Sequence, residues 1–219
     1  MSIASKIAEI NAQLPASTRL VAVSKYHPAD AVREAYEAGQ RIFGESHVQE
    51  VTAKYAELPA DIEWHFIGHL QTNKVKYIAP FIALIHSVDT EHLLDEIEKQ
   101  AAKVNRQIPV LLEVHVAQEE TKYGFSIDSL RETLKNGGLV AKYPHVLFKG
   151  IMGMASHVDD DATIRAEFHA LSSFFNEAKA WVPTFCELSM GMSGDYQIAV
   201  EEGSTLVRIG TSIFGERVY

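Results

Sequence analysis

The feature that most constrains this sequence is the regular alternation of short apolar segments with longer amphipathic ones. Leu20–Ser24 has the length of a buried strand, and the amphipathic stretch Pro28–Ala38 after it predicts a helix that stops at Gly39. Strands that alternate with helices form a parallel sheet with the helices outside it. We count roughly eight such units, with strands expected at Leu20–Ser24, Arg41–Gly44, Glu63–Ile67, Ala83–Val88, Pro109–Val116, His145–Met152, Thr184–Leu188 and Leu206–Ile209.

Eight units in about 200 residues suit a closed (β/α)8 barrel at the small end of its size range. The first residues, up to Leu14, have helical apolar spacing and predict an additional N-terminal helix. We therefore predict an α/β fold with a single TIM-barrel domain over residues 1–219. An open doubly wound sheet is the alternative, but no Gly-x-Gly-x-x-Gly motif follows the first strand.

Charge and apolar content exclude several classes of partner. The formal net charge of -9 argues against a general nucleic-acid or anionic-membrane partner. The longest apolar stretch, near Tyr77 to Ile85, contains Pro80 and is too short to span a bilayer. The single Cys186 cannot form an internal disulfide, which fits a reducing, cytoplasmic environment. Beside Phe185 it is expected to be a buried core thiol and not a nucleophile.

Lys25 ends the first apolar run and precedes the segment in which a helix is expected to begin. At the carboxyl end of a buried strand, apolar neighbours disfavour the ammonium form and lower the pKa of a lysine. A neutral lysine amine can form a Schiff base with an aldehyde. A solvated lysine at a strand end is the alternative that the local sequence leaves open.

Two glycine-containing segments follow the last two expected strands, from Ser189 to Asp195 and from Gly210 to Gly215. In barrels a phosphate often binds in these two loops, where glycines let backbone amides approach it. Ser193 and Thr211 can add hydroxyl donors. Either loop alone is better explained as a glycine turn with an ordinary helix cap. The two loops together with a Schiff-base lysine favour a phosphate site, and they indicate pyridoxal 5′-phosphate (PLP) as the cofactor.

Arg208 lies inside the last expected strand, in Val207-Arg208-Ile209. An arginine next to the pyridine nitrogen of such a cofactor keeps that nitrogen unprotonated, because two adjacent cations repel each other. This weakens the ring as an electron sink. A salt bridge at the end of the barrel is the alternative role for Arg208.

His65 and His69 have the spacing of a metal-ligand pair on a helix, but their segment is expected to be a strand and lacks His-Glu-x-x-His. We therefore predict no metal site. On a strand, His65 and Ile67 share one face, and one of them is expected to line a pocket.

Several motifs are distributed from Lys25 to Gly215, over nearly the whole chain: Ala22-Val23-Ser24-Lys25, Phe43-Gly44-Glu45, Trp64-His65-Phe66-Ile67-Gly68, Leu70-Gln71-Thr72-Asn73-Lys74, Ser189-Met190-Gly191-Met192-Ser193 and Arg208-Ile209-Gly210-Thr211. Together they resemble the pyridoxal phosphate homeostasis protein family, whose members are similar to the barrel domain of alanine racemase.

The resemblance implies that PLP is held as a Schiff base on Lys25. It also implies phosphate contacts from Ser193, Gly210 and Thr211, with Arg208 near the pyridine nitrogen. The implied role is intracellular homeostasis of PLP and vitamin B6, with PLP-dependent apo-enzymes as candidate partners and with no catalytic residue assigned. The chain departs from the family pattern at Ser46-His47 and at His115, so the contacts of those positions are not carried over.

Three functions are compatible with these residues: a PLP carrier or regulator, a PLP-dependent amino-acid racemase or decarboxylase of the alanine-racemase type, and a cofactor-free Schiff-base lyase. Racemases of that type add a second domain and dimerise, whereas this sequence ends at Tyr219, shortly after its eighth unit. The lyase accounts for Lys25 but leaves Arg208 and the two loops less well explained. We therefore expect a monomeric, non-enzymatic PLP carrier, with a racemase of low activity as the alternative.

Overall fold

The computed structural model of this chain describes residues 2–117 and 123–215. Eight parallel strands close a barrel in which each strand pairs with the next one along the chain and β8 pairs with β1. This confirms the predicted fold class. The strands are β1 (Arg19–Val23), β2 (Ile42–Glu45), β3 (Glu63–Phe66), β4 (Leu84–Val88), β5 (Ile108–Val114), β6 (Val146–Gly153), β7 (Glu187–Met192) and β8 (Leu206–Ile209).

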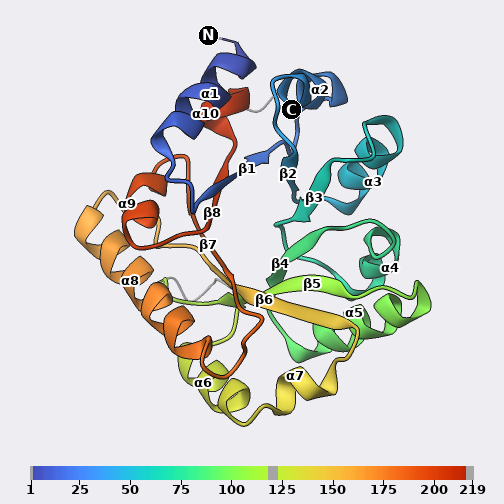
Figure 1. Cartoon of the computed structure of the whole chain (residues 1–219), viewed down its shortest axis with the longest axis vertical. Helices are drawn as coiled ribbons and strands as arrows, with labels where there is room; N and C mark the ends of the chain where they lie inside the picture. Colours follow the sequence, from blue (N-terminus) through green and yellow to red (C-terminus); the bar gives the residue numbers. More distant parts are fainter. Residues whose placement is uncertain (1, 118–122, 216–219) are drawn as a thin grey trace.

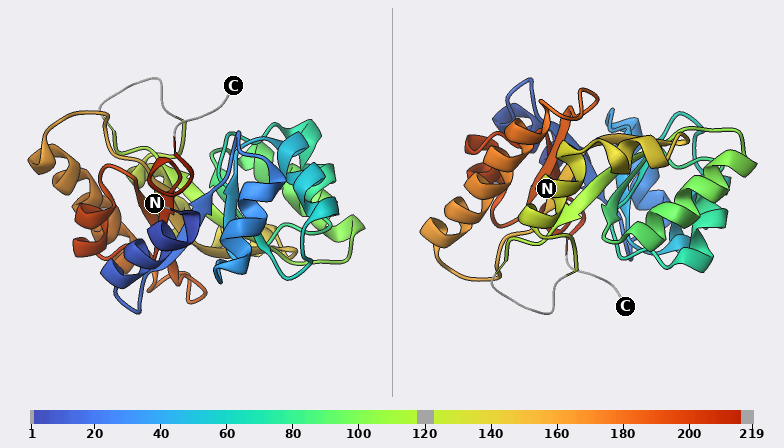
Figure 2. Two further views of the ribbon diagram at one scale, coloured as in Figure 1. Left: turned by 90° about the horizontal axis from the view of Figure 1, so that it is seen from above. Right: turned by 90° about the horizontal axis from the view of Figure 1, so that it is seen from below.

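The helices form a ring outside the strands (Figure 1), and the two side views show them flanking the strands on both sides (Figure 2). The predicted N-terminal helix lies beside α10 (Figure 1), and its Lys6 donates to the carbonyl of Ile213 at 3.1 Å. The helices are α1 (Ile3–Gln13), α2 (Ala29–Glu37), α3 (Val48–Glu57), η1 (Thr72–Lys74), α4 (Val75–Ile78), α5 (Glu91–Lys103), α6 (Ile127–Lys135), α7 (Gly138–Lys142), α8 (Asp161–Ala178), α9 (Tyr196–Glu201) and α10 (Thr211–Phe214).

Local side chains determine where several helices begin. Ser2, Thr90, Ser126 and Asp160 each accept a hydrogen bond from a backbone amide in the first turn of the following helix. These amides have no partner inside the helix, so the caps satisfy donors that would otherwise be unpaired. The long helix α8 therefore starts after Asp160, as its acidic first turn predicts.

Apolar side chains form two separate layers. Alternate strand residues such as Leu20 and Ala22 pack against the helices in one large cluster. A second cluster takes residues from six different strands and fills the inside of the barrel: Val21, Ile42, Leu84, Leu111, Met152 and Leu206. The barrel therefore has a packed core of side chains inside its strands, as is usual for this fold.

Two elements differ from the sequence-based expectation. β7 runs to Met192, so the segment from Ser189 to Met192 is strand and not loop. The glycine and serine in this segment are typical of a turn, but its backbone pairs with β6 and β8 and therefore forms a strand. The second difference is α7, which begins directly at Gly138, where the sequence indicated only a helix stop.

Close packing explains Gly150 in β6. A Cβ atom at this position would lie 1.8 Å from the carbonyl oxygen of Glu187 in β7. Its φ of 154° is also unfavourable for other residues. Within the described residues, no helix is long and apolar enough to cross a membrane.

Candidate functional site

A cavity of about 550 Å³ lies at the carboxyl ends of the barrel strands. Lys25 is half-buried in its wall, at the end of the first strand as predicted. This end of a (β/α)8 barrel is where active sites are found. Consecutive strands contribute to the wall through Lys25 after β1, Ser46 after β2, Ile67 after β3, Ser87 in β4, Glu113 in β5 and Met154 after β6.

A buried ion pair holds the loop that carries Lys25. Lys54 of α3 contacts the carboxylate of Glu45 in β2 at 2.6 Å, and it donates to the carbonyl of Ser24 at 2.9 Å. Ser24 Oγ donates to the same Glu45 oxygen at 2.7 Å. On the other side of Lys25, the amide of Tyr26 donates to a glutamate of α3 at 2.8 Å. The residues before and after Lys25 are thus both fixed to neighbouring elements.

Replacing Lys54 by methionine is expected to destabilise the fold by about 3–5 kcal/mol, because Glu45 would stay buried without its cation. Burial already raises the pKa of the Glu45 carboxyl, although Lys54 acts in the opposite direction. Urea unfolding measures the change. The double variant K54M/E45Q removes both charges and should recover most of the loss; a double variant as unstable as K54M would contradict this account.

A chain of hydrogen bonds crosses the inside of the barrel. Arg208 of β8 donates to Ser189 Oγ of β7 at 2.6 Å, and Ser189 Oγ lies 2.9 Å from Nδ1 of His86 in β4. His86 Nε2 lies 2.9 Å from Nδ1 of His65 in β3. All four side chains are buried.

The chemistry of these groups gives the chain of hydrogen bonds a direction. A guanidinium can only donate, so Ser189 accepts from Arg208 and gives its own hydroxyl hydrogen to His86. His86 then donates from Nε2 to His65. In this assignment the hydroxyl hydrogen of the buried Ser189 has an acceptor. A buried hydroxyl hydrogen without one would cost about 1–3 kcal/mol.

Arg208 is a buried cation inside the barrel. Its second contact is the carbonyl of Gly153 at 3.1 Å. Burial lowers the pKa of Arg208 to about 10, against the opposing effects of Asp195 and Glu113, so the guanidinium stays charged at neutral pH. Within residues 2–117 and 123–215 its two hydrogen bonds are those to Ser189 and Gly153, and a salt bridge at the barrel end stays an alternative role.

Acidification is expected to destabilise the fold through His65 and His86. Burial lowers the pKa of His65 to about 3 and that of His86 well below its ordinary value. The unfolded state, with a histidine pKa of about 6.5, therefore binds more protons below that pH. The free energy of unfolding should fall as the pH drops from 6.5 toward the folded pKa values, by about 2 kcal/mol at pH 5 for His65, and His86 should lower it further.

Urea unfolding at pH 7.5 and 5.0 measures this difference. In a His86→Asn variant the difference in unfolding free energy between the two pH values should be smaller, because His86 no longer contributes to it. A variant with the full wild-type difference would contradict the assignment of the pH dependence to these side chains.

The two loops predicted to bind phosphate lie side by side at the same end of the barrel as Lys25. The register of β7 and β8 pairs Met192 with Arg208, so Ser193 follows next to the end of β8. Gly210 packs against β1, since a Cβ there would be 3.1 Å from the carbonyl of the last β1 residue. Thr211 then begins α10.

These loops offer donors that fit an anion. The hydroxyls of Ser193 and Thr211 make no hydrogen bond within the described residues. The amides of Thr211 and Ser212 are the first of α10 and have no acceptor in that helix. This donor set suits a phosphate group. Ser193, Arg208, Gly210 and Thr211 do not themselves line the cavity that contains Lys25.

Only some of the positions at which the chain departs from the family pattern line the cavity. Ser46 and His47 line the cavity with Lys25, whereas His115, after β5, does not. His69 also lines it, with Nδ1 3.2 Å from Asp89 Oδ2 and its ring stacked on Tyr123. Among the described residues no three side chains of metal-ligating type form a cluster.

Cys186 is exposed, so the prediction of a buried core thiol is wrong. It follows the buried Phe185 and directly precedes Glu187, the first residue of β7. The alternation of the chain as it enters the strand turns Phe185 inward and its neighbour toward solvent.

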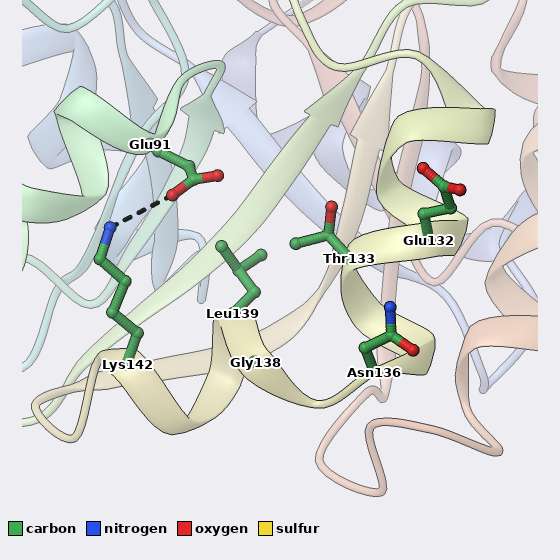
Figure 3. Close-up of a pocket in the computed structure, with 7 residues that line it drawn as sticks. All are labelled: Glu91, Glu132, Thr133, Asn136, Gly138, Leu139 and Lys142. Carbon is green, nitrogen blue, oxygen red and sulfur yellow. Dashed lines mark hydrogen bonds and ion pairs between the residues drawn. The ribbon is translucent and has the colours of Figure 1, made fainter.

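A second hollow, of about 460 Å³, lies among α5, α6 and α7 (Figure 3). Glu91 and Lys142 form an ion pair of 3.2 Å across one side of it, while Glu132 of α6 and Asn136, directly after α6, lie on the other side (Figure 3). None of the residues predicted for the functional site lines this hollow. The cavity with Lys25 is therefore the candidate site.

Sequence reasoning missed four residues around the site: Lys54, His86, Glu113 and Ser189. Two of them carry a signal that could have been used. His86 and Glu113 are polar residues in otherwise apolar strands, in Leu84-Ile85-His86-Ser87-Val88 and Leu111-Leu112-Glu113-Val114. A polar side chain at such a position must find a partner or a ligand, because burial without one is costly.

Comparison with known proteins gives consistent matches over the whole chain. Residues 1–218 match the family "Alanine racemase, N-terminal domain". The chain is 42% identical over 203 residues to the pyridoxal phosphate homeostasis protein of Aquifex aeolicus, covering 92% of this chain and 88% of that protein. It is 40% identical over 220 residues to the human protein of the same name, covering 94% and 79%.

A solved structure is similar as well. PipY of Synechococcus elongatus PCC7942 with PLP bound has a TM-score of 0.87 and 39% identity to this chain, covering 98% of this chain and all of the solved one.

Proposed function

Because the chain belongs to the pyridoxal phosphate homeostasis proteins of the alanine racemase N-terminal domain family, we propose that it binds PLP, with a covalent bond to Lys25 Nζ. Lys25 lies in the wall of a cavity at the carboxyl ends of the strands. Its loop is held by Glu45, Lys54 and Ser24, so the backbone that carries Lys25 has a defined position. PipY, at 39% identity, has a structure with PLP bound.

The proposed phosphate contacts are Ser193, Gly210 and Thr211. The hydroxyls and first amides of these loops lie at the same end of the barrel as Lys25 and have no acceptor among the described residues. Hydrogen bonds from such donors to a charged phosphate contribute roughly 1.5–3 kcal/mol each. Several of them would make the phosphate a main source of the affinity.

The single observation that carries the non-enzymatic part of the proposal is the buried, charged Arg208, held by Ser189 and Gly153. When bound, PLP supplies an aldehyde and a pyridine ring that can accept electrons. A guanidinium next to the ring nitrogen has no acceptor to offer and repels a proton there. If PLP binds with its ring nitrogen beside Arg208, the guanidinium would keep that nitrogen neutral and would weaken the ring as an electron sink.

We accordingly propose a carrier or regulator of PLP in intracellular vitamin B6 homeostasis, and no residue is assigned as catalytic. PLP-dependent apo-enzymes are its proposed partners, the cytoplasm its proposed location, and a monomeric single domain over residues 1–219 its proposed form. The alternative function is weak amino-acid racemase activity at the same site.

The racemase alternative is tested by exchange of the α-proton of L-alanine into deuterated water. The holo-protein is expected to exchange it far more slowly than typical enzymes turn over, which is about 1–10³ per second. An Arg208→Glu variant, which can accept a hydrogen bond from a protonated ring nitrogen, is expected to exchange faster if it retains PLP. Wild-type rates in the range of typical enzymes would favour the racemase.

A further inference from the structure

Glu113 is a buried carboxyl in the wall of the cavity that contains Lys25, and the proposed function does not use it. The residue is 6% exposed. Within residues 2–117 and 123–215 its carboxylate makes no hydrogen bond and no ion pair. Its oxygens are not among the fully buried, unpartnered side-chain atoms of the described residues, so the carboxyl faces the cavity, where a ligand group can pair with it.

The backbone of Glu113 is fixed on both sides. It pairs with Met152 of β6, and its carbonyl accepts from the amide of Phe125 at 2.8 Å. A Cβ at Gly124 would be 2.8 Å from the same carbonyl, so the turn before Phe125 packs directly on the strand. The carboxyl therefore projects from a rigid strand, which is the usual foundation of a precise binding site.

The charges around Glu113 favour a bound cation. Asp89, directly after the neighbouring strand β4, is 8% exposed and is paired with His69. Burial and the Asp89 charge raise the pKa of Glu113 to about 7, while Arg208 acts in the opposite direction. Two nearby carboxylates repel each other, and a cation at Glu113 relieves that repulsion. The other ionisable groups of the cavity wall are Lys25, Tyr26, His47, His69, Lys74 and Tyr123.

The acceptors near Glu113 suit a primary ammonium. Ser87 of β4 lines the same cavity and donates its hydroxyl hydrogen to the carbonyl of Gly68, which leaves the oxygen as an acceptor. An ammonium group carries three donors, and both the Glu113 carboxylate and Ser87 Oγ are acceptors in the wall of this cavity. A divalent metal needs more ligands than this, and no metal-type cluster exists among the described residues.

We propose that Glu113 binds the ammonium group of an incoming primary amine in the same cavity as Lys25. This rests on the proposed function, since the amine would compete with Lys25 for the cofactor. The carboxylate binds the ammonium and takes one proton from its nitrogen, which gives a neutral amine and a protonated carboxyl. Only that proton moves. The neutral amine has the lone pair that an attack on a carbonyl carbon needs.

The probe is propylammonium, with 1-propanol as the neutral molecule of similar size. Carbon-13 NMR of the side-chain carboxyls follows Glu113 in the apo-protein, and its signal is identified by its loss in E113Q. Propylammonium should shift this signal in a saturable way and 1-propanol should not. Because only the ionised carboxyl binds the cation, affinity should rise about tenfold from pH 6 to pH 8.

Matched variants separate charge from shape. E113Q keeps the size of the side chain and should lower propylammonium affinity at least about tenfold, while E63Q, an exposed glutamate at the opposite end of the barrel, should not change it. E113D keeps the charge, so a folded E113D should still bind. Equal shifts with propylammonium and 1-propanol, or equal affinity in wild type and E113Q, would overturn the proposal.

The holo-protein gives a second readout. Release of PLP by propylamine, followed by visible absorbance, should be slower in E113Q than in wild type and E63Q. Failure of the wild type to take up PLP on Lys25 would refute the proposed function. The titration of the apo-protein with propylammonium would still show whether Glu113 binds an ammonium group. Uptake of PLP with equal release rates in all variants would refute the role of Glu113 alone.

Discussion

Replacement of Lys25 by alanine is expected to abolish the covalent bond to PLP completely. The buried Glu45–Lys54 ion pair fixes the residue before Lys25, and a hydrogen bond from the Tyr26 amide to α3 fixes the residue after it. The variant should lose the visible absorbance of the bound cofactor. It should also bind PLP more weakly, because only the phosphate and ring contacts remain. Absorbance titration with PLP measures both effects.

Lys74 provides the matched control, because it lines the same cavity from the segment after β3. K74A should keep the visible absorbance and the covalent attachment. Loss of the covalent attachment in K74A, together with its retention in K25A, would show that PLP is bound to Lys74 and not to Lys25. Thermal unfolding of both variants shows whether either has lost its fold.

Pyridoxal, which lacks the phosphate, is expected to bind about 10²–10⁴-fold more weakly than PLP. Two charge-assisted hydrogen bonds of roughly 1.5–3 kcal/mol each account for a difference of this size. The donors are the hydroxyls and amides of Ser193, Thr211 and Ser212 at the ends of β7 and β8.

The variant S193A isolates the phosphate contribution. It should weaken PLP binding by about tenfold or more and leave pyridoxal binding unchanged, since it removes one donor to the phosphate. Ser204→Ala is not a suitable control, because that hydroxyl is buried against β7 and β8. Thr133→Ala, on α6, is a suitable one. Equal affinities of the wild type for the two aldehydes would rule out a phosphate site.

The order of strands could be predicted because each strand is a short apolar run that precedes an amphipathic segment. Leu20–Ser24 and Leu206–Ile209 match β1 and β8 closely for this reason. The end of β7 could not be predicted, since Ser189 to Met192 contains turn-type residues and becomes strand only through pairing with β6 and β8. Tertiary pairing overrides local propensity there.

The site could be predicted only where local sequence carries the signal. Lys25 and Gly210 follow strand ends, and a parallel barrel brings all such ends to one rim. The chain of hydrogen bonds from Arg208 to His65 joins β8, β7, β4 and β3, and no periodic pattern connects residues so far apart in sequence. Glu113 was missed because the local sequence does not show that its side chain faces the cavity with Lys25.

The most direct test of the central claim is borohydride reduction of the wild-type protein with bound PLP, followed by peptide mass mapping. Reduction makes the bond between the lysine nitrogen and the cofactor carbon permanent. The account predicts a pyridoxyl group on the peptide that contains Lys25, and only there. The modification on the peptide of Lys74 or of Lys122, which lies outside the described residues, would contradict it.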